Sequence, residues 1–340
     1  MTTKAPQLSR RATSYDVAVA AGVAQSTVSR CFQADSNISE GTRAHVRAVA
    51  EKLGYTPNAL ARSLITRRSQ TVGVIITRYT LRNSPNLLYS LSEALGEVKQ
   101  RLILLAVEDD ESAHSILDSA LEYPLDGLIS CANMRAQDVK RFVDHHVPVL
   151  FFNRHPPAGR VDCISTDQLR GAGDMAAALV QAGYRNFLCV GGPEHAPVSQ
   201  ERTRGFNQQL RREGIPPAEV LATDFSYDRG RTVFLEAMRA GARPDCVFCA
   251  NDQLAFGVID ACRYELGLRV PEDIAVAGFD DIPEAERPSY SLTTVRQPTT
   301  HMARQAIQLL VQRIAHPSRS AQHTAIRGEL VSRSSAPIAR

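Results

Sequence analysis

Short apolar runs alternate with amphipathic helical patterns from Thr71 to near the end of this chain, and no other feature restricts its fold as strongly. Alternating strands and helices at this spacing predict parallel sheets with helices on both faces. Because about 270 residues exceed one doubly wound sheet, we expect two α/β lobes whose strand ends face a cleft that closes on a ligand. The runs lie at residues 72–76, 102–107, 127–130, 147–152, 187–191, 246–250 and 274–278.

The first 70 residues differ from this body in charge. They hold ten Lys and Arg but four Asp and Glu, whereas the remaining residues hold 29 of the chain's 39 basic and 32 of its 36 acidic residues. A small basic head on a mildly acidic body indicates a module that binds a polyanion. Charge alone leaves a solvated basic surface as an equal alternative.

Residues 13–56 carry the pattern of three short helices. Thr13 followed by Asp16 forms a capping box that starts the first helix, and Gly22 is placed to end it with a tight turn. A second helix is expected over 25–32, and a third from an N-cap at Ser39. Two short helices joined by a glycine turn and closed by a third predict an all-α helix-turn-helix domain. The apolar residues expected to face its core are Val17, Ala20, Ala21, Val28, Val46, Val49, Ala50 and Leu53.

The second helix of such a domain enters the major groove of DNA, so its exposed side chains must reach base edges. Gln25 and Arg30 carry suitable donors and acceptors, and Ser26 is short and adaptable. A three-helix bundle with polar faces in solvent is the alternative interpretation of the same residues. Contacts with phosphate groups would position the domain on DNA. Five polar residues could make such contacts, namely Thr13, Thr27, Ser29, Asn37 and Tyr55.

Two stretches of the head carry a dense resemblance to a known family. The first reads Tyr15-Asp-Val-Ala, Ala-Gly-Val and Ser-Thr-Val-Ser-Arg, and the second Leu-Gly-Tyr-Thr-Pro-Asn-Ala-Leu-Ala-Arg-Ser-Leu64. Together they closely resemble the lactose/galactose repressor (LacI/GalR) family. One departure is Ala24, where the family usually has a serine that caps the recognition helix, and its absence should cost about 1 kcal/mol of capping.

The resemblance implies a hinge helix and linker over residues 57–69. Pro57 suits a first helical turn, but about two turns are too few for a helix that is stable by itself. In the family, such helices order on operator DNA, one from each protomer. Leu64 matches the apolar wedge that opens a base step in the minor groove, and Asn58 and Ala61 match positions that contact this groove.

The resemblance continues over residues 70–340 and implies two doubly wound parallel-sheet lobes of the periplasmic-binding-protein type. The first lobe is expected over about 70–165 and 297–322, and the second over about 166–295 and 323–336. Amide, carboxylate, guanidinium and aromatic groups are suited to binding a sugar in the cleft between these lobes. Six residues match cleft positions of the family or end a strand run: Asn153, Arg154, Arg202, Phe225, Asn251 and Asp280. The alternatives are a turn at the end of a strand for Asp280 and a core position for Phe225.

The loop after the first strand departs from the family pattern. It reads Thr77-Arg-Tyr-Thr-Leu-Arg-Asn-Ser-Pro, which places Arg78 and Tyr79 where a ligand-contacting pair would be. With Arg154 and Arg202, Arg78 would put three cations around the cleft. This predicts an anionic effector, such as a sugar acid or sugar phosphate, because carboxylates and phosphates pair with guanidinium groups. The alternative is that these arginines pair with protein carboxylates or face solvent.

The sequence contains no G-x-S-x-G, Walker or G-x-G-x-x-G motif, and no carboxylate pair stands out as catalytic. We therefore expect no enzyme, no cofactor and no metal. Seven scattered cysteines do not predict a disulfide framework, and Cys246 and Cys249 favour buried strand positions over a metal or redox pair. No apolar run could span a membrane and no signal peptide pattern follows Met1, so a cytoplasmic protein is expected.

These observations predict a transcription regulator, acting as a repressor on a pseudo-palindromic operator in double-stranded DNA and controlled by a small sugar-like effector. Palindromic half-sites require a two-fold homodimer. The resemblance places its contacts on first-lobe helices, here residues 87–98 and 113–121. Two other classes compete: a solute-binding protein with a vestigial head, and a sugar-modifying enzyme. The intact head disfavours the first of these, and the missing catalytic motifs disfavour the second.

Overall fold

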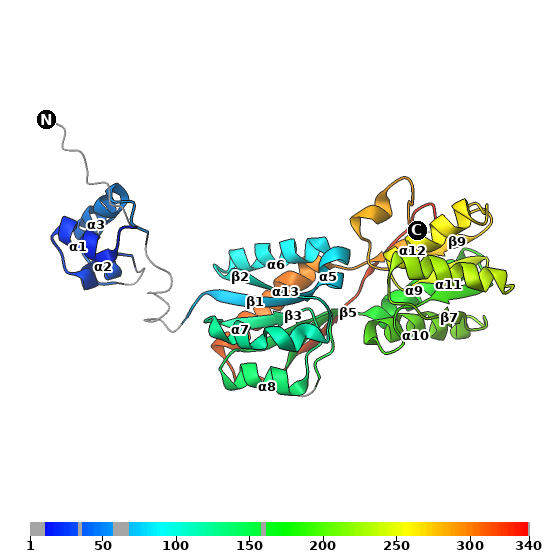
Figure 1. The fold of residues 1–340 in the computed structure, drawn as a ribbon, viewed down its shortest axis with the longest axis horizontal. Coiled ribbons are helices and arrows are strands. Elements are labelled where there is room, and N and C mark those ends of the chain that lie inside the picture. The colour runs from blue at the N-terminus through cyan, green and yellow to red at the C-terminus, as the bar shows by residue number, and fades with distance from the viewer. Residues whose placement is uncertain (1–10, 33–35, 57–67, 158–160, 339–340) are drawn as a thin grey trace. The chain divides into compact units, whose positions relative to one another are not determined.

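The computed structural model describes residues 11–32, 36–56, 68–157 and 161–338. The chain forms two compact units that divide between Ser69 and Gln70. The smaller unit is the all-α head and the larger is the α/β body (Figure 1). In the described ranges, no helix is both long and apolar enough to cross a membrane.

Three helices form the head, and their boundaries follow local capping chemistry. The capping box is confirmed: the Thr13 amide donates to Asp16 Oδ2 at 2.8 Å, and the Asp16 amide donates to Thr13 Oγ1 at 3.4 Å. Gly22 ends the first helix at φ 66°, and the Ser39 hydroxyl caps the third. The bounds are α1 Ser14–Ala21, α2 Gln25–Cys31 and α3 Glu40–Lys52.

The core of the head differs from the predicted stripe at one position. Val17, Ala18 and Ala21 are buried with Val28 and Val46, but Ala20 is exposed. The prediction for Ala20 is wrong because residues i, i+1 and i+4 define the buried face of α1, and Ala20 lies beside it.

The first lobe is built on a parallel six-stranded sheet in the order β11-β5-β4-β3-β1-β2. Helices α6 and α13 cover one face of this sheet, and α7 and α8 cover the other (Figure 1). The strands are β1 Thr71–Thr77, β2 Arg101–Val107, β3 Gly127–Ser130, β4 Val149–Phe152, β5 Asp162–Thr166 and β11 His323–Ile326. The helices are α5 Arg78–Asn83, α6 Pro85–Glu97, η1 Ser112–Ile116, α7 Leu117–Glu122, α8 Ala136–Asp144 and α13 Thr299–Ala315.

The second lobe is built on a parallel four-stranded sheet in the order β7-β6-β8-β9. Helices α9 and α10 pack on one face of this sheet, and α11 and α12 on the other. The strands are β6 Phe187–Val190, β7 Glu219–Leu221, β8 Cys246–Cys249 and β9 Ala275–Ala277. The helices are α9 Gln168–Gln181, α10 Pro197–Arg212, α11 Tyr227–Arg239, α12 Asp252–Tyr264 and η2 Pro283–Glu286.

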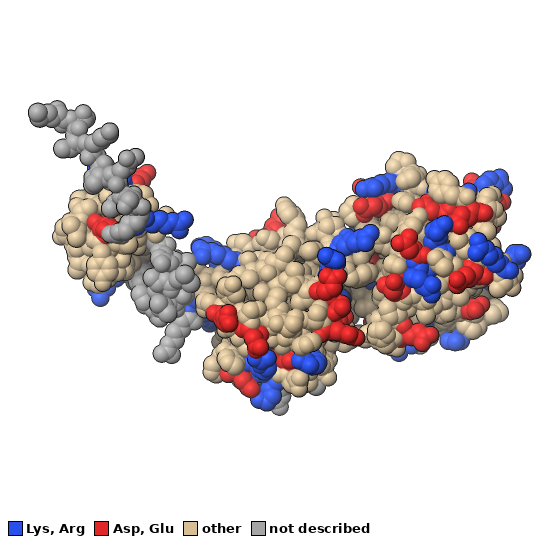
Figure 2. All heavy atoms as spheres, viewed as in Figure 1, with Lys and Arg blue, Asp and Glu red and all other residues tan. Residues whose placement is uncertain are grey.

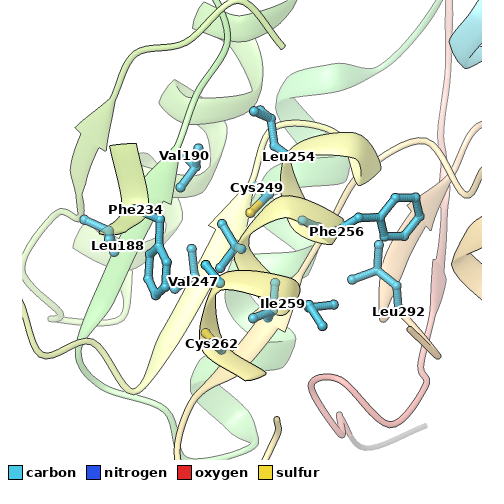
Figure 3. Packing of buried hydrophobic residues seen from close by; sticks show 14 of the residues in the cluster. Leu188, Val190, Phe234, Val247, Cys249, Leu254, Phe256, Ile259, Cys262 and Leu292 are labelled. Atoms are coloured by element: carbon cyan, nitrogen blue, oxygen red, sulfur yellow. The ribbon is translucent and has the colours of Figure 1, made fainter. Parts of the chain in front are cut away.

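The β8 strand confirms the expectation for its two cysteines. Cys249 packs with Leu254 and Phe234 under α11 and α12, as Figure 3 shows. Cys246 packs on the opposite face of the sheet with Phe206. Both thiols are free and fully buried, and burial raises the pKa of each well above its usual value, so both remain protonated. These cysteines therefore serve as core residues.

Three segments connect the lobes. The chain crosses after β5, between β10 Thr294–Arg296 and α13, and between β11 and β12 Glu329–Val331, where β10 and β12 pair antiparallel. One predicted boundary is wrong here: the sequence assigned residues from 323 onward to the second lobe, but His323–Ile326 pairs with β5 in the first sheet. These residues form the edge strand β11 of the first sheet, so the first lobe extends to Ile326.

Candidate functional site

The candidate recognition helix α2 presents a polar face. Ser26 and Arg30 are exposed one turn apart, and the Arg30 guanidinium makes no ion pair within the described part of the chain. Gln25 is half-buried, because its amide donates to Ser14 Oγ at 3.1 Å and to Ser29 Oγ at 3.3 Å. Helix α2 therefore presents the Arg30 guanidinium and the Ser26 hydroxyl, with the side-chain carbonyl oxygen of Gln25 beside them.

The residues expected to contact phosphate are spread around this helix. Thr13 and Asn37 are exposed, and Thr27 is half-buried on α2. The Tyr55 ring packs edge-on against Phe32 at a centroid distance of 5.8 Å, which fixes the end of α3 against the end of α2. Ala24 precedes α2 and provides no side-chain cap, as predicted. The hinge residues lie outside the described residues: Asn58, Ala61 and Leu64.

A cavity of about 310 Å³ opens between the two lobes of the body. Strand ends and following turns line it, which is where doubly wound folds place ligands. Six residues expected at the cleft from the sequence do line it: Tyr79, Asn153, Arg154, Arg202, Phe225 and Asp280.

Two residues expected at the cleft do not line it. Arg78 lies at the start of α5, where the Thr77 cap turns the chain, and its largely exposed side chain pairs with Glu108 at 3.1 Å. Asn251 is 1% exposed and lies behind the cavity wall. Its Oδ1 accepts the Leu254 amide at 2.8 Å to cap α12, and its Nδ2 donates to the Tyr79 hydroxyl at 2.6 Å.

Arg202 is the central buried cation of the cleft. Its Nη2 donates to Asp280 Oδ1 at 2.8 Å, and its Nε donates to Gln168 Oε1 at 2.8 Å. A further N–H binds the Ala250 carbonyl oxygen, and the guanidinium lies 3.8 Å from the centroid of the Phe279 ring. Arg202 is therefore held within the protein, and its charge is balanced by Asp280.

Three residues of the cleft have positive φ angles, a backbone conformation that residues other than glycine rarely adopt. Asn153 has φ 52°, Phe225 has φ 68° and Asp280 has φ 120°. Such strain costs of the order of 1–3 kcal/mol per residue and concentrates at ligand sites. A Cβ atom on Gly192 would lie 2.2 Å from the Phe225 ring, so only glycine allows the ring to rest there.

Gln297 joins the lobes and was missed by the sequence analysis. It lies in the second crossing segment, where its Nε2 donates to Asp280 Oδ1 at 2.6 Å. Its Oε1 accepts from Asn153 Nδ2 and from Thr166 Oγ1, each at 2.7 Å. Gln297 lies within residues 70–340, which the resemblance covers, but its hydrogen-bond partners are distant in sequence and no local pattern marks it.

The charge of the cavity lining differs from the sequence expectation. Arg154 donates to Thr80 Oγ1 at 3.0 Å, and its Nε lies 4.0 Å from Asp110 Oδ1. All three arginines of the anionic-effector prediction thus face a protein carboxylate. The lining contains two arginines, Arg154 and Arg202, against five carboxylates: Glu108, Asp109, Asp110, Asp224 and Asp280.

A fully buried carboxyl lies next to this site. Asp252 is 0% exposed; its Oδ1 accepts the Thr294 hydroxyl at 2.6 Å and its Oδ2 accepts the Ile282 amide at 2.9 Å. Burial raises the pKa of Asp252 well above its usual value, and the Asp280 carboxylate raises it further. Burial also raises the pKa of Asp280, against the opposing charge of Arg202.

We expect Asp252→Asn to stabilise the protein at alkaline pH. The unfolded carboxyl ionises at about pH 4, below its folded-state pKa, so stability falls as pH rises from there through the folded value. Asparagine keeps an acceptor for Ile282 and can donate to the Thr294 oxygen, without ionising. Urea unfolding should show a larger free energy of unfolding than wild type at pH 8 and a flatter pH dependence. An equal loss of stability at pH 5 and pH 8 would contradict this expectation.

Both the head and the body match known protein families. Residues 13–58 match the family described as bacterial regulatory proteins, lacI family, and residues 176–336 match the periplasmic binding protein-like domain. The ribose operon repressor of Escherichia coli K12 is 33% identical over 331 residues, which cover 96% of this chain and 100% of that protein.

Solved structures show the same architecture. The lac repressor dimer bound to operator and the anti-inducer ONPF has a TM-score of 0.86 at 26% identity, covering 96% of this chain and 100% of that one. A LacI family regulator from Enterococcus faecium with bound ribose has a TM-score of 0.70 at 25% identity, covering 79% of this chain and 100% of that one.

The fold and the site define a ligand-responsive DNA-binding regulator: a helix-turn-helix head joined to a two-lobed body with a cavity between the lobes. The chain belongs to the lacI family of bacterial regulatory proteins. It is a transcriptional repressor with a periplasmic-binding-protein-like effector domain, not an enzyme.

Proposed function

We propose that this repressor binds operator DNA as a homodimer and that a neutral monosaccharide, bound between the lobes of the body, controls its affinity for the operator. The interlobe cavity carries the proposal, because it combines polar groups from both lobes with aromatic walls. Asp280 Oδ1 is used by Arg202 and Gln297, while its Oδ2 makes no hydrogen bond among the described residues. That oxygen can accept from a sugar hydroxyl.

The balance of charge favours a neutral effector over an anionic one. An added carboxylate or phosphate would enter a lining with more carboxylates than arginines, and both arginines already have acidic neighbours. Figure 2 shows acidic and basic side chains interspersed on the viewed face of the second lobe. The related ribose operon repressor and the ribose-bound regulator support a sugar of this size.

The head supports operator binding through the exposed face of α2. Ser26 and Arg30 are exposed on α2, and with Gln25 they remain predictions for contacts with base edges. The predictions for phosphate contacts are Thr13, Thr27, Ser29, Asn37 and Tyr55. Asn58, Ala61 and Leu64 remain predictions for the minor groove.

The first lobe supports dimerisation. Helix α6 exposes Tyr89, which is 71% exposed, and the edge strand β2 exposes Leu104, which is 41% exposed. Large apolar side chains on neighbouring elements of one sheet edge are typical of an interface between subunits. The solved lac repressor is a dimer on its operator, and a two-fold dimer would present two heads to a pseudo-palindrome.

The proposal is tested by selecting genomic DNA fragments with the full-length protein and then titrating the enriched duplex by fluorescence anisotropy. We expect one or more neutral pentoses or hexoses to change the apparent operator affinity by about 5- to 150-fold, the usual range of allosteric coupling. Sugar acids and sugar phosphates should have little effect. A response confined to these anions would overturn the neutral-effector proposal and support the anionic one.

Arg30→Ala tests the role of the head in this experiment independently of the body. If Arg30 binds a base edge through two hydrogen bonds, its loss should weaken specific binding by about 1–3 kcal/mol. The same variant should keep the wild-type thermal shift with sugar, because the body is unchanged. If the wild-type protein enriched no duplex, with or without the sugars, the proposed operator binding would be wrong.

A further inference from the structure

We propose that Tyr79 is a specificity-determining residue that restricts the effector cavity to a single sugar ring by covering Asn251 from the opposite lobe. This inference rests on the proposed function and names the size of its ligand. Tyr79 belongs to α5 in the first lobe, whereas Asn251 and Phe225 belong to the second. The Tyr79 hydroxyl accepts from Asn251 Nδ2 at 2.6 Å, and the Tyr79 and Phe225 ring centroids are 5.7 Å apart.

The contact uses up the polar groups of Asn251. Its Nδ2 donates to the Tyr79 hydroxyl and to the Phe225 carbonyl oxygen at 3.1 Å, while its Oδ1 accepts the Leu254 amide. A ligand hydroxyl can therefore reach this amide only if Tyr79 moves away. The sequence placed Asn251 at the cleft, but the Tyr79 hydroxyl takes the hydrogen bond that an effector hydroxyl would otherwise accept from it.

Tyr79 is held in this position from both sides. The Thr77 hydroxyl accepts the Thr80 amide at 3.1 Å and fixes the start of α5, and Asn83 Nδ2 donates to the Tyr79 carbonyl oxygen at 2.8 Å. On the other side, the Phe225 ring packs closely on Gly192. Although 37% of the residue's surface is exposed, burial of the hydroxyl raises the pKa of Tyr79 far above its usual value, so it stays neutral.

The cavity is small for a ligand pocket. Its volume of about 310 Å³ lies at the lower end of the range of about 300–1,000 Å³ for small-molecule pockets. The Tyr79 and Phe225 rings form its wall on the Asn251 side, and removing the Tyr79 ring would extend the cavity to that amide. A second sugar ring could then bind where the phenol now lies.

The test is calorimetric titration of the full-length protein with neutral pentoses and hexoses and with disaccharides that contain the preferred ring. Wild type should bind a monosaccharide and bind the matching disaccharides at least about 100-fold more weakly, a gap of two tenfold steps. Tyr79→Ala should reduce this preference by about tenfold or more, because the second ring gains space. Tyr79→Phe keeps the ring and should still reject disaccharides.

Tyr264→Ala is the matched control, since this tyrosine is 80% exposed at the end of α12, outside the cavity lining. Its sugar profile should equal that of wild type, and thermal unfolding should confirm that every variant is folded. If Tyr79→Ala binds the monosaccharide yet rejects disaccharides as wild type does, the inference fails and the proposed function stands. Wild-type preference for a disaccharide would overturn both the inference and the proposal of a monosaccharide effector, while control by a sugar would remain. If wild type binds no sugar, the proposed function fails, and the inference with it.

Discussion

Arg202→Met should destabilise the body by about 3–5 kcal/mol, the usual cost of removing one partner from a buried ion pair. Arg202 is 3% exposed, and its guanidinium is the cation beside the Asp280 carboxylate. Methionine fills much of the same space but leaves Asp280 buried without its counter-charge. It also releases Gln168 and the Ala250 carbonyl oxygen. Urea unfolding monitored by circular dichroism measures the loss.

The same variant should lose its response to the effector. In the proposed function Asp280 accepts from a ligand hydroxyl. Without Arg202 its carboxylate keeps the hydrogen bond from Gln297 but loses its second donor and its counter-charge, so its charged form is less stable. Arg204→Met is the matched control, because Arg204 is exposed two residues further along the same helix. That control should retain wild-type stability and ligand response.

A double variant separates the lost charge pairing from lost packing. Adding Asp280→Asn to Arg202→Met removes the unpaired charge, so we expect part of the lost stability to return. Equal stability of Arg202→Met and Arg204→Met would show that the buried pair contributes nothing. If the double variant were less stable than Arg202→Met, packing rather than charge would be the cause of the loss.

The sequence predicts most of the sheet framework, because buried parallel strands are continuous apolar runs. All seven predicted runs contain strands of the two parallel sheets. The strands that were missed are of a different kind. Strands β7 and β11 lie at sheet edges and are partly exposed, and β5 contains Asp162, whose buried carboxylate is paired with Arg313 at 2.9 Å. A pairing across 151 residues leaves no local pattern.

The candidate cleft is predicted less completely, for a related reason. Asn153 and Asp280 follow strands of the two different sheets, whose carboxyl ends face the cleft. Arg202 lies on α10, and only the family resemblance placed it at the cleft. Sequence reasoning counts charges but does not show which of them are paired. Arg78 was expected to face the ligand, yet it pairs with Glu108 on the surface. The anionic-effector hypothesis rested on treating such cations as free.

Glycine contacts are a further feature that the sequence does not reveal. Gly205 on α10 and Gly173 on α9 both lie at the junction of these two helices, and either could be read as a small residue of no consequence. The structure separates them. A Cβ atom on Gly205 would lie 2.1 Å from the Leu169 carbonyl oxygen, whereas one on Gly173 would lie 3.5 Å from its nearest neighbour, the Gly205 carbonyl oxygen.

Gly205→Ala should therefore destabilise the body although alanine is the better helix former. The propensity gain is about 1 kcal/mol, but the methyl group meets rigid backbone of α9 and the helices must move apart, which costs of the order of 3 kcal/mol or more. Gly205 lies three residues from Arg202 on α10, so the displacement should also move the guanidinium from Asp280 and weaken effector binding. Urea unfolding and effector titration measure the two effects.

Gly173→Ala provides the opposite expectation from the same interface. Its methyl group would make ordinary van der Waals contact with α10, so the propensity gain should remain, and the variant should equal wild type or exceed its stability by up to about 1 kcal/mol. Both substitutions replace a helical glycine by alanine. If one lowers the free energy of unfolding and the other does not, the difference can come only from the contact that the added methyl group makes. If Gly205→Ala were as stable as Gly173→Ala, the close approach of α10 to the Leu169 carbonyl group would not exist in solution, and Arg202 would lack the support inferred for it.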